Sequence, residues 1–179
     1  MSEEQLARIK APIRTISNFP KPGVEFRDVT TLLGNAQAFA EVTDLLAEQC
    51  QALGATTICA VEARGYIFGA PVAYKLGLRF VPVRKPGKLP AEVIRQSYSL
   101  EYGENVLELH KDSLNDQDRV IIIDDLVATG GSAKAAAQLV ERLGAKVVGM
   151  GFVVELPDLG GRETLKDYKV FSLLEFAGE

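Results

Sequence analysis

The stretch that decides the fold is Val120-Ile-Ile-Ile-Asp-Asp-Leu-Val-Ala-Thr-Gly-Gly-Ser-Ala133. Its four opening residues are apolar and β-branched, which predicts a strand buried on both faces. Asp124 and Asp125 stand where that strand should end, and an alanine-rich segment, residues 133–143, then predicts a helix. This order is typical of an open α/β sheet, which binds ligands at the carboxyl ends of its strands.

The turn between the predicted strand and helix has the composition of a phosphate-binding loop. Gly130 and Gly131 let the backbone point successive N–H groups at one place, and the hydroxyls of Thr129 and Ser132 add donors. The helix N-terminus adds partial positive charge. A glycine pair alone is as often an ordinary turn, but the ordered context favours a phosphate site.

Length, composition and charge set outer bounds on the function. A chain of 179 residues, 47% hydrophobic and 25% charged, is typical of one soluble globular domain. Its net charge of −4 offers no basic surface for nucleic acid. No apolar run approaches the length of a membrane span, and the acidic N-terminus is unlike a signal peptide. Cys50 and Cys59 fit buried core positions in a reducing compartment, so we expect a cytoplasmic protein.

Strand and helix patterns alternate along most of the chain. We expect strands at 57–61, 79–84, 146–155 and 169–176, helices at 2–13, 36–53 and 66–76, and a β-hairpin over 94–110. A strand–helix–strand order predicts parallel pairing. The expected architecture is an α/β fold with a mostly parallel sheet flanked by helices, formed by a single domain, residues 1–179. Within it, residues 1–35 make a small N-terminal hood and residues 36–179 the core, with a mobile loop near 84–102.

Two further stretches carry candidate chemistry. Glu62-Ala-Arg-Gly65 ends one predicted strand just before a helix, so it is either a plain turn with an exposed arginine or a second anion-binding loop. Residues 84–90 combine three cations with prolines and a glycine, which predicts an exposed loop. These charges are either simply solvated or form a lid that closes over an anion.

Residues 120–133 resemble the motif with which type I phosphoribosyltransferases bind 5-phospho-α-D-ribose 1-diphosphate (PRPP). From about Ile16 to Phe176, five stretches resemble the adenine-specific members of that family: 19–28, 62–65, 84–90, 100–103 and 124–131. The resemblance implies the type I phosphoribosyltransferase fold, a homodimer, and purine salvage in which adenine and PRPP give AMP and diphosphate. The alternatives are transfer to another base (xanthine, hypoxanthine, guanine or orotate) or a PRPP-sensing regulator of the same fold.

The resemblance also implies a role for each matching residue. Those expected to bind PRPP and AMP are Asp124, Asp125, Ala128, Thr129, Gly130, Gly131, Ser132 and Ala133. Those expected to bind pyrophosphate are Ala63, Arg64, Gly65, Arg84, Lys85, Lys88 and Tyr102, with a non-proline cis peptide in the 62–65 loop. Adenine is expected to contact Phe26, Arg27 and Val127.

Glu101 is the expected catalytic residue. When N9 of a purine attacks the ribose, the imidazole ring of the purine gains positive charge. A carboxylate near N7 can then take the proton that N7 carries. The oxopurine enzymes of the family carry an aspartate for this contact just before Thr-Gly, where this chain has Ala128, so Glu101 is the available carboxylate. Mg²⁺ is expected to bind mainly through diphosphate and ribose oxygens, without dedicated protein ligands.

Overall fold

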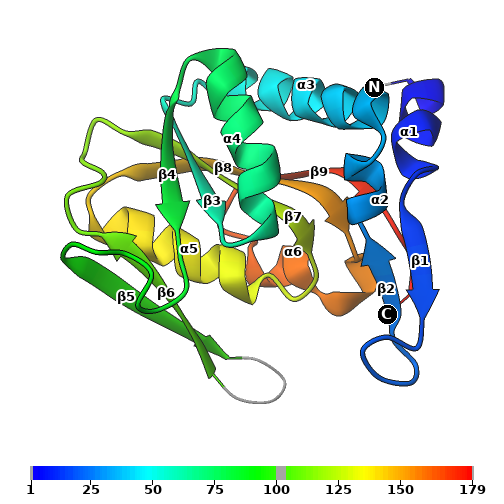
Figure 1. Ribbon diagram of the computed structural model, residues 1–179. Coiled ribbons are helices and arrows are strands. Elements are labelled where there is room, and N and C mark those ends of the chain that lie inside the picture. The colour runs from blue at the N-terminus through cyan, green and yellow to red at the C-terminus, as the bar shows by residue number, and fades with distance from the viewer. Residues whose placement is uncertain (1, 100–103, 179) are drawn as a thin grey trace.

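A computed structural model describes residues 2–99 and 104–178 (Figure 1). Its centre is a five-stranded sheet in the order β4-β3-β7-β8-β9. These strands are β3 Thr57–Val61, β4 Arg79–Val83, β7 Arg119–Val127, β8 Lys146–Glu155 and β9 Val170–Glu175. Each neighbouring pair is parallel. The predicted α/β fold with a mostly parallel sheet is therefore confirmed.

Helices cover both faces of the sheet. The strand β7 alternates between two apolar layers: Ile121 and Ile123 pack in the layer that contains helices α3 (Ala36–Ala52) and α4 (Arg64–Leu76). Val120 and Ile122 pack in the other layer, against α5 (Gly131–Arg142). All four β7 residues are fully buried, as the apolar run predicts. The first half of β7 is thus held between the two layers.

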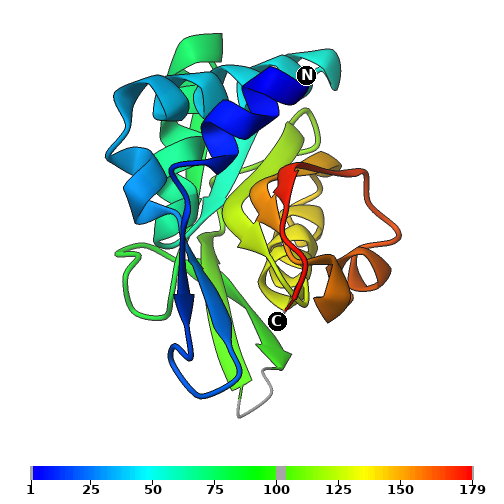
Figure 2. The same ribbon diagram turned by 90° about the vertical axis from the view of Figure 1, so that its right-hand side faces the viewer.

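The N-terminal hood departs from its expected form. Helix α1 (Glu3–Lys10) ends before Pro12, and Arg14–Ser17 forms strand β1, which the sequence pattern did not predict. It pairs antiparallel with β2 (Glu25–Asp28) in a separate two-stranded sheet, followed by the short helix α2 (Thr30–Leu33). In Figure 2 this hairpin extends toward the same end of the molecule as a second hairpin.

Asp28 fastens the end of the hood hairpin. Its carboxylate accepts the Thr30 hydroxyl at 2.5 Å and amide at 3.0 Å, and pairs with Arg14 Nη2 at 2.6 Å. Since these donors favour the charged form, the Thr30 and Arg14 hydrogen bonds lower the pKa of Asp28 to about 2.

The second hairpin joins β5 (Val93–Ser99) to β6 (Glu104–His110), as expected. Between β8 and β9 the chain makes a 3-10 turn, Pro157–Leu159, and the short helix α6 (Gly161–Thr164). Among the described residues, no helix is long and apolar enough to cross a membrane.

Both cysteines are unpaired and fully buried in the core, as expected. Burial raises the pKa of the Cys50 thiol to about 12 and also raises that of Cys59. Neither thiol has the low pKa or the exposure of a reactive cysteine.

Candidate functional site

A cavity of about 310 Å³ lies at the carboxyl ends of β3 and β7. It is lined by Val61, Glu62, Ala63, Arg64, Lys85, Tyr98, Asn105, Asp124, Asp125 and Ser132. The structure therefore brings the 62–65 loop, the acid pair, the basic loop and the first turn of α5 to one place. This is the edge of a parallel sheet where ligands are expected to bind.

The acid pair at the end of β7 is held in two different ways. Asp125 is buried and its carboxylate forms an ion pair with Arg64 Nε. Asp124 Oδ1 accepts the Asp125 backbone amide at 2.9 Å. Burial, and then the neighbouring Asp125 carboxylate, raise the pKa of Asp124 well above its usual value. Both carboxyls line the cavity, and their oxygens can accept hydrogen bonds from sugar hydroxyls.

The 62–65 loop lies directly on the end of β7 because of Gly65. A Cβ at this position would lie 2.7 Å from the Ile123 carbonyl oxygen and 3.2 Å from Asp124 Cα. Only a glycine permits that approach, which brings Arg64 within reach of Asp125. The Glu62–Ala63 peptide bond is cis, in agreement with the resemblance.

The glycine turn leads into α5 two residues earlier than expected, at Gly131 instead of Ala133. Gly130 adopts a left-handed conformation (φ 80°) and precedes the helix. The first hydrogen bond of the helix runs from the Lys134 amide to the Gly130 carbonyl oxygen, at 3.0 Å. The amides of the first turn have no partner within a helix's own ladder, so those of residues 131–133 are the donors that this turn presents.

Behind the turn, Gly130 lies close to a second loop. A Cβ on Gly130 would lie 3.0 Å from the Gly161 carbonyl oxygen, and a Cβ on Gly161 would lie 2.5 Å from the Ala128 carbonyl oxygen. The start of α6 therefore supports residues 128–130 from behind. Thr129 is exposed.

The basic loop is anchored by a carboxylate that the sequence analysis did not assign to the site. Glu62 Oε2 lies 3.2 Å from Arg84 Nε and accepts the Lys85 amide at 3.0 Å. Burial opposes ionisation of Glu62, but the Lys85 amide, Arg84 and Lys88 outweigh it and lower its pKa. The Arg84 guanidinium also donates to the Lys88 carbonyl at 3.0 Å. In its sequence context Glu62 is only the residue before Ala-Arg-Gly, and no local signal pairs it with Arg84.

A second buried carboxylate holds the same loop from the other side. Glu108 on β6 accepts the Gly87 amide at 2.9 Å and Arg95 Nε at 2.6 Å. The hairpin itself reaches the cavity through Tyr98 and Asn105, which face each other across β5 and β6. Neither residue was predicted, although both flank the stretch 100–103. Glu101 and Tyr102 themselves lie outside the described residues.

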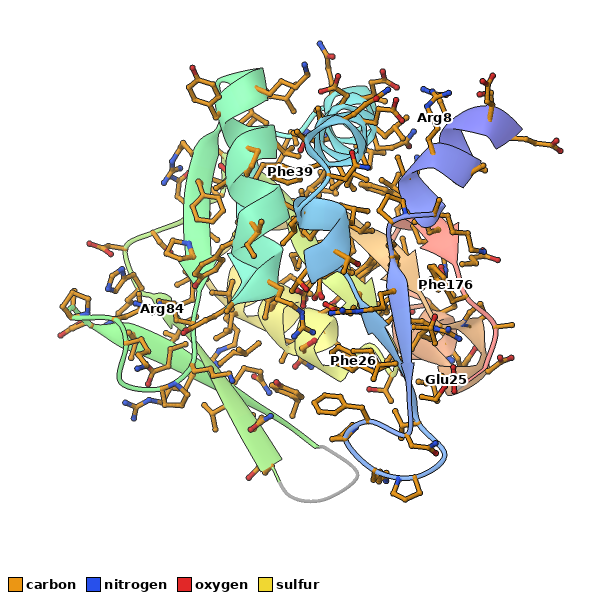
Figure 3. All side chains as sticks on the ribbon, turned by 45° about the vertical axis from the view of Figure 1, so that its right-hand side comes forward. Arg8, Glu25, Phe26, Phe39, Arg84 and Phe176 are labelled. Carbon is orange, nitrogen blue, oxygen red and sulfur yellow. The ribbon has the colours of Figure 1, made fainter. Side chains whose placement is uncertain are left out.

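The residues expected to contact adenine do not line this cavity. Phe26 on β2 makes an edge contact with Phe19, with ring centroids 5.2 Å apart. Val127 is buried at the end of β7 and packs beside Gly161. The Arg27 guanidinium points elsewhere and contacts Thr15 and the C-terminal segment. Figure 3 shows Phe26 and Phe176 on opposite sides of the hood hairpin, and Arg84 away from both.

No group of three or more acidic, histidine or cysteine side chains suited to a metal occurs within residues 2–99 and 104–178. The carboxylates that line the cavity are those of Glu62, Asp124 and Asp125, of which Glu62 pairs with Arg84 and Asp125 with Arg64. This donor set fits a Mg²⁺ ion that takes most of its ligands from a substrate and water.

Comparison with known proteins agrees with this geometry. Residues 28–178 match the family described as "Phosphoribosyl transferase domain". An adenine phosphoribosyltransferase from Shewanella pealeana is 53% identical over 181 residues, covering 100% of this chain and 99% of the relative. The crystal structure of adenine phosphoribosyltransferase from Thermoanaerobacter pseudethanolicus is 50% identical, with a TM-score of 0.92 over 96% of this chain and 99% of that chain. That of Saccharomyces cerevisiae, complexed with an imino-altritol bisphosphate and adenine, is 38% identical, with a TM-score of 0.92 over 97% and 100%.

The family match covers more than half of the chain, and the relatives match over nearly all of it. The chain belongs to the phosphoribosyltransferase family, among the adenine phosphoribosyltransferases.

Proposed function

We propose that the cavity at the ends of β3 and β7 binds PRPP and transfers its phosphoribosyl group to adenine. Family membership makes the chain a pentosyltransferase that converts adenine and PRPP to AMP and diphosphate in purine salvage. The observation that carries the assignment of the site is the meeting of the acid pair, Arg64 and the first turn of α5 in one cavity.

Each part of the cavity suits one part of PRPP. The first-turn amides of residues 131–133, with the Thr129 and Ser132 hydroxyls, are donors for the 5′-phosphate. Asp124 and Asp125 accept the ribose hydroxyls. Arg64 and the loop cations Arg84, Lys85 and Lys88 attract the diphosphate. The reacting carbon then lies between the ribose and diphosphate parts, where the departing anion meets fixed positive charge.

Mg²⁺ would bind mainly to substrate oxygens, with Asp124 or Asp125 contacting the hydroxyls or a metal-bound water. When bound, the ion neutralises charge on the leaving diphosphate and orients it. The ribose and the diphosphate are otherwise positioned by the side chains named above.

The base is proposed to lie between Phe26 and Val127, with Glu101 exchanging the proton at N7. Consecutive residues of a strand point to opposite faces, so Phe26 and Arg27 cannot both face the base through their side chains. The relative from Saccharomyces cerevisiae was crystallised with adenine, which supports a base site in this fold.

We also propose a location and an oligomeric state for the protein. A cytoplasmic location is supported by two free, buried thiols. A homodimer is supported by Ile67 and Tyr74, which are exposed on the same helix, α4, by 40% and 90%. Sedimentation of the wild type beside Tyr74→Lys would test the second, since the charge should disrupt self-association at this face.

The direct test of the function is an assay of diphosphate release with PRPP, Mg²⁺ and one base at a time. Adenine should support turnover, whereas hypoxanthine, guanine, xanthine and orotate should not. Asp125→Asn should weaken PRPP and AMP binding together, because it removes a carboxylate that pairs with Arg64 and contacts the ribose. Asp44→Asn is a matched control, since Asp44 is exposed and pairs with Lys75 on α4. Release of diphosphate with another base and not with adenine would overturn the proposal.

A further inference from the structure

Arg27 links the hood hairpin to the C-terminal segment. Its Nη1 donates to Thr15 Oγ1 at 2.5 Å, and its Nη2 donates to the Ala177 carbonyl at 2.9 Å. Its guanidinium carbon lies 5.1 Å from the centre of the Phe176 ring. The side chain is only 11% exposed, and its Nε is buried without a hydrogen-bond partner among the described residues. Burying a charged guanidinium costs free energy unless its contacts compensate, so an arginine kept in this position indicates a structural role.

Phe176 receives a second cation from the hood. Lys10 at the end of α1 places its Nζ 4.6 Å from the centre of the same ring and donates to the Glu175 carbonyl at 2.8 Å. The segment 175–178 is also tied to the core. The Phe176 amide donates to the Glu155 carbonyl at 3.0 Å, and the Gly178 amide donates to Asp158 at 2.8 Å. This segment therefore bridges the hood and the end of β8.

Buried Ile13 and Val29 join one end of the hairpin to the core, but β1 and β2 form a sheet of their own, with no strand pairing to the central sheet. Its hydrogen-bonded ladder fixes Phe26 relative to Arg27, but not relative to the core. A side-chain contact on the Arg27 face thus sets the position of Phe26 on the other face.

We propose that Arg27, Phe176 and Ala177 form a clasp that holds the hood hairpin in place and so positions Phe26 for the purine base. Arg27 is then a positioning residue, and its side chain does not read the base. This proposal rests on the proposed function and assigns the expected contact between Arg27 and adenine to the Arg27 backbone, not to its side chain.

Two single variants break the clasp from opposite sides. Arg27→Met keeps the aliphatic stem and removes the guanidinium, whereas Phe176→Leu leaves the hood sequence intact and removes the ring. Each should raise the KM for adenine about tenfold, as expected for the loss of a buried cation–π contact and its hydrogen bond, with the KM for PRPP unchanged. Arg27→Lys keeps a cation over the ring, so its KM for adenine should lie between those of the wild type and Arg27→Met. Arg8→Met is the matched control, because Arg8 pairs with Glu41 outside the clasp.

The double variant separates a clasp from direct recognition of the base. If Arg27 and Phe176 act as one unit, Arg27→Met with Phe176→Leu should raise the KM for adenine little more than either change alone. Effects that multiply, or a Phe176→Leu enzyme with wild-type KM, would overturn the clasp and favour direct recognition by Arg27.

Hydrogen exchange provides a readout that does not depend on the reaction. In Phe176→Leu the amides of β1, residues 14–17, should exchange faster than in wild type, while those of β7 should not change. Unchanged exchange in the hood would overturn the clasp even if the KM values shifted. If the wild type fails to use adenine, the proposed function fails, and hydrogen exchange still decides whether the clasp exists.

Discussion

Gly65→Ala is the substitution whose effect follows most directly from the structure. The added Cβ would lie 2.7 Å from the Ile123 carbonyl oxygen, 3.0 Å from Asp124 Oδ1 and 3.2 Å from Asp124 Cα. Two of these three atoms belong to the backbone of β7, which is buried between two apolar layers. A side-chain rotation cannot relieve the clash, so the 62–65 loop must move away from the strand.

We expect this displacement to destabilise the protein by about 1–3 kcal/mol, the usual range for overpacking a fixed site. For a chain of this size, that lowers Tm by about 2–12 °C. Because Arg64 moves with the loop, its ion pair with Asp125 should also be lost, and PRPP should bind more weakly. Calorimetric melting and titration with PRPP measure the two effects separately.

Gly34→Ala provides the control for Gly65→Ala. Gly34 has a helical backbone (φ −70°), and a Cβ there would lie 3.5 Å from its nearest neighbour, an ordinary contact. This change should alter stability by no more than about 0.5 kcal/mol. The reasoning would be wrong if Gly65→Ala had the same Tm as Gly34→Ala and bound PRPP like the wild type. The close approach of the loop to β7 would then contribute nothing to stability or binding.

Three other substitutions test the charges. Asp124→Asn should raise Tm at pH 7, because the raised pKa makes ionised Asp124 unfavourable in the folded state, and the gain should shrink as pH falls toward about 4; a lower Tm at pH 7 would contradict this. Asp28→Asn should have the opposite sign: the lowered pKa stabilises the fold above the unfolded-state pKa, so melting curves should show a loss of about 2 kcal/mol at pH 7 that fades as pH falls toward about 2. Lys88→Ala should weaken binding of PRPP and diphosphate far more than adenine in titrations; equal effects would argue against a lid.

Local patterns predicted the parts of the site that are formed by neighbours in sequence. The β-branched run ending in Asp124 and Asp125 needs only burial on both faces to become a central strand, and the glycine turn follows from its own backbone freedom. Consequently the sequence predicts the strand, the acid pair and the helix that follows, although the strand extends to Val127 and the helix begins at Gly131 instead of Ala133.

Contacts between distant segments were not predictable in the same way. Glu62 meets Arg84 only because β3 and β4 pair in a register that aligns their ends. Arg27 precedes an aspartate and follows an aromatic residue, and nothing near it indicates a partner at Ala177. Strand β1 was missed because its register with β2, and not its own composition, makes it a strand.

The two buried thiols have a practical consequence. Iodoacetamide reacts with thiolates, so at neutral pH the folded protein should resist alkylation at both Cys50 and Cys59. An unfolded chain exposes both groups with an ordinary pKa and becomes modified. Brief labelling followed by mass spectrometry would thus count unfolded molecules directly, and it would rank the stabilities of all the variants above without an engineered cysteine.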